Sequence, residues 1–152
     1  RGRPSRGGGT ADFQEAALED AGLALAAEGE EYLPMDSGLV RRAISNLVSN
    51  AMRHARRDST IRVVMARSGD EVSLAVENLG EDIDAPELPR LFERFYRAAQ
   101  ARAGSASHHG LGLAIVAAIA RMHGGRTFAT SGDGLTRIGL TLRDPDLREA
   151  GN

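Results

Sequence analysis

The sequence has 152 residues, of which 41% are hydrophobic, and its formal net charge at pH 7 is −2. This length and apolar content suit one ordinary globular domain, and the charge excludes the basic excess of a dedicated nucleic-acid binder. Because the chain has no cysteine, disulfides, thiolate metal sites and a cysteine nucleophile are excluded. No run of roughly 18 apolar residues offers a membrane span, so we expect a soluble domain.

The first part of the chain predicts a linker and a connecting segment. Residues 1–10 (RGRPSRGGGT) are rich in Gly, Arg and Ser and bury too little apolar surface to become ordered, so we expect a disordered linker. Residues 11–35 would connect it to the domain. Within them, residues 12–28 are rich in Ala, Leu and Glu, a composition that predicts a helix. A start at Arg1 instead of methionine indicates a piece of a longer protein.

A helix and a β-hairpin are predicted next. From Gly38 to Arg57, apolar residues recur at spacings of three, four and seven, which places them on one side of a helix. Alternating apolar residues at 61–65 and 72–76, separated by a Ser-Gly-Asp turn, predict two antiparallel strands. Asn78 shares the parity of the second set, so its side chain is expected on the buried face, where a polar group needs a partner.

The second half of the chain predicts a loop, a buried helix and two strands. Residues 97–109 are polar or small and show no periodicity, which predicts a mobile loop. Residues 110–122 are apolar almost all round and too few to span a bilayer, which predicts a helix in the core. Strands are expected near residues 126–130 and 136–142, before a polar tail at 144–152.

The first chemical motif lies on the helix predicted to end at Arg57. Asn46 and Asn50 are four positions apart and therefore share one helix face, with Arg53 beside them and away from the apolar stripe. A carboxamide oxygen is a hard, neutral ligand of the kind that Mg²⁺ takes in addition to phosphates and water. The alternative interpretation is a solvated polar face with two incidental asparagines.

Three later motifs each have a structural alternative. Asn78 ends a predicted strand just before a glycine, where its carboxamide can bind an exocyclic amine or merely shape the turn. Residues 91–97 (LFERFYR) are by themselves typical of core packing with two snorkelling arginines. Gly110 and Gly112 open a helix after a loop, where free backbone amides and the helix dipole favour phosphate. No Walker lysine follows them, and Ile115 occupies the third glycine of a dinucleotide-binding pattern.

Together, in this order, the four motifs resemble those of a known family. Asn-x-x-x-Asn-Ala, Glu-Asn-x-Gly, Leu-Phe-Glu-Arg-Phe-Tyr-Arg and Gly-Leu-Gly-Leu-Ala-Ile-Val with a later His-Gly-Gly resemble the N, G1, F and G2 boxes of bacterial sensor histidine kinases, in the GHKL or Bergerat superfamily. The resemblance covers roughly Asp36 to Leu142, and we assign residues 36–143 to one catalytic domain. Asn78, in place of the usual aspartate, resembles the heavy-metal-sensor branch.

The resemblance implies a fold and an activity. The fold would be an α/β two-layer sandwich of the Bergerat type, a mixed β-sheet packed on one face by helices, with residues 97–109 as a flexible ATP lid. The activity would be ATP-dependent phosphorylation of a histidine on an upstream dimerisation domain, for relay to a response regulator in a two-component system. The full-length protein would be a homodimer anchored in the bacterial inner membrane, with this domain in the cytoplasm.

The resemblance also implies roles for individual residues, with ATP and Mg²⁺ as cofactors. Asn50 matches the Mg²⁺ ligand, and Asn46 and Arg53 match its polar and basic neighbours at the phosphates; these three form the catalytic set. His54 matches an aromatic position near adenine, and Asn78 the residue that reads the adenine amine. The other positions that match nucleotide contacts are Gly80, Ile83, Arg94, Arg97, Gly110, Leu111, Gly112 and Leu113.

Two alternatives stay open. Asn78 is neutral, Asp82 replaces a second glycine and so restricts the backbone, and His108 replaces a leading glycine. These departures suggest the first alternative, a nucleotide-binding module without transfer activity. The other alternative is a serine kinase of the anti-sigma type, which shares the fold. Related ATPases carry a glutamate at the position of Asn46 to activate water, and an amide cannot take a proton, so the resemblance favours a kinase over a hydrolase.

Overall fold

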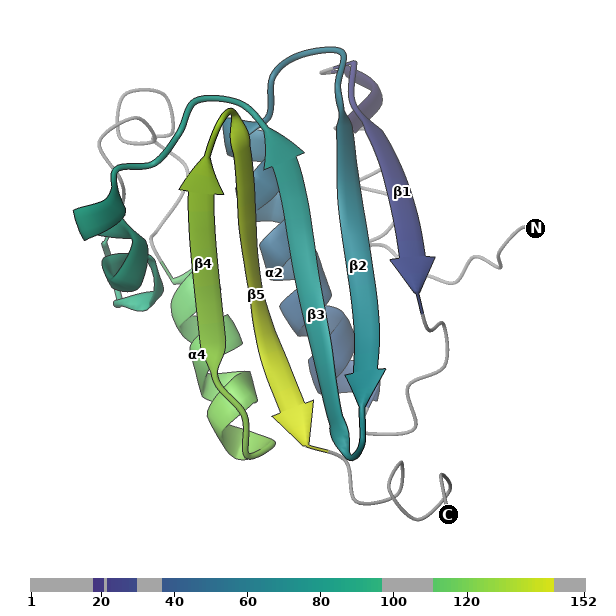
Figure 1. The fold of residues 1–152 in the computed structure, drawn as a ribbon, viewed down its shortest axis with the longest axis vertical. Coiled ribbons are helices and arrows are strands. Elements are labelled where there is room, and N and C mark those ends of the chain that lie inside the picture. Colours follow the sequence, from purple (N-terminus) through teal and green to yellow (C-terminus); the bar gives the residue numbers. More distant parts are fainter. Residues whose placement is uncertain (1–17, 21, 30–36, 97–110, 144–152) are drawn as a thin grey trace.

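The computed structural model describes residues 18–20, 22–29, 37–96 and 111–143, which form one five-stranded sheet with helices on one of its faces (Figure 1). The predicted linker, the lid over residues 97–109 and the polar tail lie outside the described residues. The proposed limits of the domain therefore remain predictions.

The sheet is mixed, as expected. Its strands lie in the order β1-β2-β3-β5-β4, where β1 runs parallel to β2 and all other neighbours are antiparallel. The predicted hairpin of β2 and β3 is confirmed, because Ser68 pairs with Glu71 across a two-residue turn. The strands are β1 (Ala24–Gly29), β2 (Thr60–Ser68), β3 (Glu71–Leu79), β4 (Thr127–Gly132) and β5 (Leu135–Arg143).

The helix predicted over residues 12–28 is wrong in its second half. Residues 24–29 form β1, an edge strand that pairs with β2 from Thr60 to Met65. Among the described residues of this segment, only 18–20 are helical, and Gly22, with φ of 70°, turns the chain after them. The Ala-rich composition favours a helix locally, but pairing with the free edge of β2 overrides this weak propensity.

The long predicted helix is α2 (Ser37–His54), and it crosses one face of the sheet (Figure 1). Its apolar stripe is buried against the strands; Val40, Leu47 and Val48 are at most 2% exposed. The helix ends at His54 and not at Arg57 as predicted. The N–H of Arg56 donates to the carbonyl of Leu79 at 2.7 Å, so the chain leaves the helical path to meet the end of β3.

Helix α4 (Gly112–Met122) lies beside α2 on the same face, and the 3₁₀ helix η1 (Ala85–Phe92) contacts α4 and β4. The prediction that α4 belongs to the core is confirmed, because Val116, Ile119 and Ala120 are buried. Leu91 of the predicted apolar patch is buried as well. Pro89 within η1 lacks the N–H that a continuous α-helix requires there.

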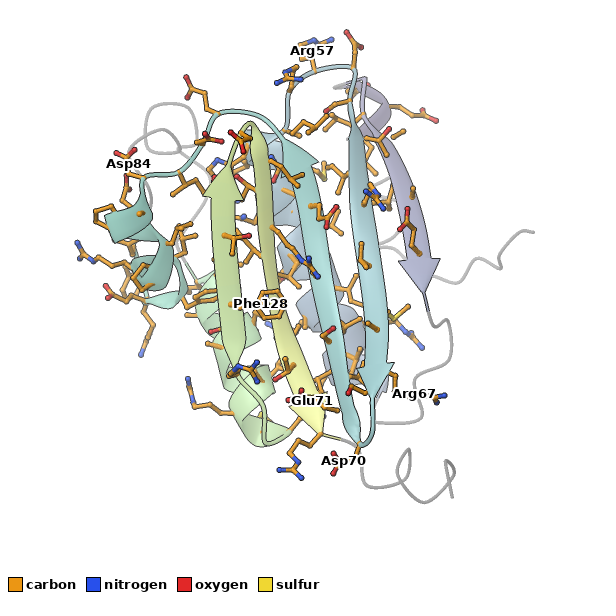
Figure 2. The ribbon with its side chains drawn as sticks, viewed as in Figure 1. Arg57, Arg67, Asp70, Glu71, Asp84 and Phe128 are labelled. Carbon is orange, nitrogen blue, oxygen red and sulfur yellow. The ribbon has the colours of Figure 1, made fainter. Side chains whose placement is uncertain are left out.

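The two faces of the sheet differ in character. On β3, Asn78 points to the helix-covered face with the apolar residues of the same parity, as predicted. The open face instead carries ion pairs from strand to strand, with Arg62 and Glu77 at 3.4 Å and Glu77 and Arg137 at 3.9 Å. Phe128, labelled on the open face in Figure 2, lies beneath the guanidinium of Arg137. Asn78 of the second motif is therefore on the covered side, whereas Glu77 of the same motif is on the open face.

Candidate functional site

The second half of α2 presents polar side chains beside its buried stripe. Asn46, Asn50 and Arg53 share one face of this helix. Asn50 is only 6% exposed, and Nη2 of Arg53 donates a hydrogen bond to its Oδ1 at 2.9 Å. A carboxamide has a single oxygen, so the acceptor of Asn50 is already directed towards a positive charge. A metal cation at this position would compete with Arg53 for the same oxygen.

Asn46 joins α2 to the start of α4. Its Nδ2 donates to the carbonyl oxygen of Gly112 at 3.2 Å, across 66 positions of sequence. Gly112 is the first residue of α4, and the first turn of an α-helix presents backbone N–H groups and the positive end of the helix dipole, both of which favour an anion. The structure thus brings the first and fourth motifs together. Of the flanking residues, Leu111 is half-buried and Leu113 is buried.

The end of β3 meets the end of α2. Asn78 is 2% exposed, and its Nδ2 lies 3.4 Å from the carbonyl oxygen of Leu79. At Gly80 a side chain has no room, because a Cβ atom there would lie 2.2 Å from the carbonyl oxygen of His54. Glycine is required at position 80 for this close approach of two backbones.

An open pocket of about 440 Å³ lies where these two ends meet, and it is lined by Arg53, His54, Arg56, Gly80 and Glu81. Its volume falls within the usual range of small-molecule sites. It lies near the end of the sheet at which Figure 2 labels Arg57, opposite the end that carries Asp70 and Glu71. The second motif therefore joins the first.

Burial lowers the pKa of His54 below its ordinary value of 6.5, and the charge of Arg53 lowers it further. The neutral imidazole is favoured, and a neutral aromatic ring suits a position beside a planar heterocycle. Arg56 and Glu81 also line the pocket, but they are not among the site residues predicted from the sequence. No helical spacing could have found Arg56, because α2 has already ended at His54.

The loop that leaves β3, residues 80–83, is named here the post-strand loop. Ile83 is buried, and its N–H donates to Oγ of Ser131 at 2.9 Å. Oδ1 of Asp82 accepts a hydrogen bond from the N–H of Gly134 at 2.8 Å. The restriction expected at Asp82 produces no strain, because it is not among the described non-glycine residues with positive φ, which are Asp58, Phe95 and Asp133.

Arg94 lies in a different hollow from Arg53 and His54. It is exposed, with its guanidinium 5.3 Å from the ring centre of Phe95. Together with Leu111 and Ile115, it lines a groove of about 660 Å³ between η1 and α4. The structure therefore does not bring Arg94 to the pocket at the end of β3. Arg97, His108 and Gly110 lie outside the described residues.

Comparison with known proteins identifies the family and the fold of this chain. Residues 35–146 match the family described as histidine kinase-, DNA gyrase B-, and HSP90-like ATPase. Sensor protein IrlS of Burkholderia pseudomallei (strain K96243) is 45% identical over 76% of this chain and 25% of its own length. Sensor protein CzcS of Cupriavidus metallidurans is 41% identical over 84% of this chain and 26% of its own length. Sensor histidine kinase CusS of Escherichia coli (strain K12) is 42% identical over 86% of this chain and 28% of its own length. The chain thus spans about a quarter of the length of these curated relatives.

Two solved structures share the fold. A mycobacterial sensor histidine kinase, MprB, superposes with a TM-score of 0.74 at 25% identity, over 88% of this chain and 92% of that one. A nucleotide-free catalytic domain of the histidine kinase ThkA superposes with a TM-score of 0.74 at 19% identity, over 91% of each chain. These superpositions confirm the α/β sandwich with a mixed sheet.

Proposed function

Because this chain belongs to the family of histidine kinase-, DNA gyrase B- and HSP90-like ATPases, we propose that it binds ATP and transfers the γ-phosphoryl group to a histidine of an upstream dimerisation domain. A response regulator would then receive the phosphoryl group. The domain is of the ATP-binding type that sensor histidine kinases carry, and the curated relatives bear the names of sensor proteins and sensor histidine kinases.

One observation carries the proposal, namely the hydrogen bond from Asn46 to the carbonyl of Gly112. It holds the polar face of α2 against the first turn of α4. A helix face with a hard carboxamide oxygen and a guanidinium then stands beside a helix N-terminus, and this combination suits a phosphate chain charged with a divalent cation.

The donor set of the site fits Mg²⁺ and ATP. The oxygen of Asn50 is neutral, hard and already directed towards a cation, so we propose it as the metal ligand. We propose Asn46 and Arg53 at the phosphates, and His54 and Asn78 at the adenine. The residues proposed to surround the nucleotide are Gly80, Ile83, Gly112 and Leu113. Leu111 lines the other groove together with Arg94, so its contact with the nucleotide is implied by the resemblance alone. Arg94, Arg97 and Gly110 remain phosphate contacts that only the resemblance implies.

The residues of this chain would act by positioning and charge neutralisation. When bound, Mg-ATP supplies the transferable phosphoryl group. Arg53 and the first turn of α4 would offset its negative charge, while Asn46 holds the two helices at a constant separation. The amide of Asn46 cannot accept a proton, so it would not activate water for hydrolysis. The neutral imidazole of the acceptor histidine on the upstream domain, by contrast, is already a nucleophile. This chemistry favours transfer to histidine over hydrolysis.

The proposal assigns membrane anchoring, the acceptor histidine and dimerisation to other parts of the full-length protein. In the described part of the chain, no helix has both the length and the apolar character needed to cross a membrane. We propose that the membrane anchor, the acceptor histidine and the dimer interface belong to other segments of a homodimeric inner-membrane kinase whose catalytic domain faces the cytoplasm. This chain spans only about a quarter of the length of the curated relatives, which supports the assignment of these functions to other segments.

The test has two stages. The domain is first titrated with Mg-ATP and with ADP by calorimetry, and binding is expected for both. It is then incubated with γ-labelled ATP and the upstream domain of the same protein, and the label on that domain should be labile to acid and stable to alkali. No binding at millimolar nucleotide would indicate a degenerate domain. An acid-stable phosphoserine product would indicate a kinase of the anti-sigma type and contradict the proposal.

A further inference from the structure

The post-strand loop is fastened to a single hairpin, that of β4 and β5. The N–H of Gly80 donates to the carbonyl of Gly134 at 2.9 Å. In the reverse direction, the N–H of Gly134 donates to Oδ1 of Asp82 at 2.8 Å. The N–H of Ile83 donates to Oγ of Ser131 at 2.9 Å. These three hydrogen bonds are named here the hairpin clasp, and they span the whole loop.

One end of the hairpin clasp leads back to the candidate adenine position. Oγ of Ser131 lies 2.7 Å from Oγ1 of Thr136, and either hydroxyl can donate. Thr136 is 2% exposed and is the register partner of Asn78 across β3 and β5. A chain of polar contacts therefore runs from Ile83 to the strand pair that contains Asn78.

Asp82 replaces a glycine of the family pattern, and its carboxylate makes one bond of the hairpin clasp. Because φ of Asp82 is not positive, no glycine is needed at this position. Gly134, by contrast, has φ of 82°, so the residue that donates to Asp82 is the one that needs to be glycine. A hydrogen bond from an amide to a charged oxygen is stronger than a neutral one. Since Asp82 is exposed, solvent reduces this advantage.

The hairpin clasp acts on the wall of the pocket. Gly80 and Glu81 line the pocket, and the two bonds of Gly134 hold the residues on either side of Glu81. A loop that is ordered before a ligand arrives does not have to lose conformational freedom during binding. Loss of the hairpin clasp would therefore weaken binding without removing any group that touches the ligand.

We propose that Asp82 and Ser131 are positioning residues of the nucleotide site, which hold the post-strand loop in the arrangement that forms the adenine side of the pocket. This inference rests on the proposed function, since the occupant of the pocket is taken to be the adenine of ATP. Asp82 and Ser131 act through the backbone of Gly80, Glu81 and Ile83.

The first experiment measures the dissociation constants of Mg-ATP and Mg-GTP for the wild type, Asp82→Ala and Asp82→Asn. Asp82→Ala is expected to bind Mg-ATP about fivefold more weakly, the usual effect of one lost hydrogen bond. Asp82→Asn keeps the Oδ1 acceptor and should stay within about twofold of the wild type. The matched control is Asp84→Ala, because Asp84 carries the same charge nearby and makes no capping side-chain hydrogen bond.

Nucleotide selectivity separates positioning from stability. If the hairpin clasp shapes the adenine side, Asp82→Ala should reduce the preference for ATP over GTP by about the same factor of five. Arg53→Ala, at the phosphate side, should weaken both nucleotides equally. A purely structural role for Asp82 would lower the unfolding temperature and leave the preference unchanged.

Ser131 provides an independent second variant. Ser131→Ala removes the acceptor of the Ile83 N–H and the partner of Thr136. Ser131→Thr keeps a hydroxyl and suits a β-strand, so it should rescue affinity and selectivity. The same pattern as for Asp82 is expected, with a loss of about fivefold in the alanine variant only.

The outcomes distinguish this inference from the proposed function. If the wild type binds Mg-ATP and both Asp82→Ala and Ser131→Ala keep its affinity and selectivity, the positioning role is wrong. The proposed function would then still stand. Equal losses in Asp82→Ala and Asp82→Asn would also overturn the positioning role, because the charge and not the acceptor would then matter. If the wild type fails to bind Mg-ATP, the proposed function is wrong and this inference falls with it.

Discussion

The two sides of the candidate site are held by different kinds of contact. On the α2 side, Arg53 reaches Asn50 three positions earlier on the same helix, side chain to side chain. On the opposite side, the post-strand loop bonds to Ser131 and Gly134, which lie 48 and 52 positions from their partners. Two side chains on one helix can exchange partners while the backbone stays in place. In the hairpin clasp every donor is a backbone amide, and the bond from Gly80 to the carbonyl of Gly134 opens only if the backbone moves.

This difference suggests a division of labour. In our proposal, the α2 side gives up its internal bond for the ligand, because a cation at Asn50 would repel the guanidinium of Arg53 towards the phosphates. In our proposal, the hairpin side provides a preformed wall against which the adenine is placed. Polar groups that exchange partners are therefore expected at the phosphate end, and preformed backbone geometry at the adenine end.

The largest expected effect comes from removing the side-chain oxygen of Asn50 on the α2 side. Asn50→Ala deletes the proposed metal ligand, and we expect the affinity for Mg-ATP to fall by at least about 100-fold, equal to about 2.7 kcal/mol. Calorimetric titrations with and without Mg²⁺ would measure this, and circular dichroism would verify that the fold is intact. The control is Arg42→Ala, an exposed change on the same helix. Unchanged affinity in Asn50→Ala would remove this residue from the proposed ligands.

The next effect comes from separating the two sides where they touch. Gly80→Ala would place a Cβ atom 2.2 Å from the carbonyl oxygen of His54, so the end of α2 must move away from the end of β3. We expect unfolding free energy to fall by about 2 kcal/mol, as for other overpacked sites. Urea denaturation provides the measurement.

The chain offers a matched control for this substitution. A Cβ atom at Gly132 would have no heavy atom within 4 Å, and its φ is not positive. Gly132→Ala should therefore change the unfolding free energy by no more than about 0.5 kcal/mol. Equal destabilisation by the two substitutions would show that the close approach at Gly80 does not limit the fold.

The smallest expected effect is on the pH dependence of the unfolding free energy, and it concerns His54 on the α2 side. The pKa of His54 is lower in the folded protein than its ordinary value of 6.5, because burial and the charge of Arg53 oppose protonation. As the pH falls below 6.5, His54 takes up a proton more readily in the unfolded chain than in the folded protein. The unfolding free energy therefore decreases as the pH falls through 6.5 and is higher above it.

His54→Gln should remove this part of the pH dependence. One histidine changes the slope of unfolding free energy by less than about 1.4 kcal/mol per pH unit, so both proteins need to be measured at several pH values between about 5 and 8. A smaller slope in the variant is expected. Identical slopes would mean that the environment of His54 does not disfavour its charged form.

Much of this architecture could be predicted from the sequence because it depends on local periodicity. The helical spacing in α2, the alternation in β2 and β3 and the apolar run of α4 each identify an element from neighbours along the chain. The parity of β3 also placed Asn78 on the buried face, and the four-residue spacing placed Asn46 and Asn50 on one helix face. The sequence by itself determined these features, since each depends on residues only a few positions apart.

Only the tertiary structure decided the remaining features, and the physical reason is distance along the chain. Residues 24–29 became the strand β1 because β2 offered them backbone partners, against a helical composition. The need for glycine at position 80 comes from the carbonyl of His54, and the role of Asp82 comes from the N–H of Gly134. Local propensities amount to tenths of a kilocalorie per residue, whereas contacts between distant segments decide where a helix ends and which glycine is replaceable.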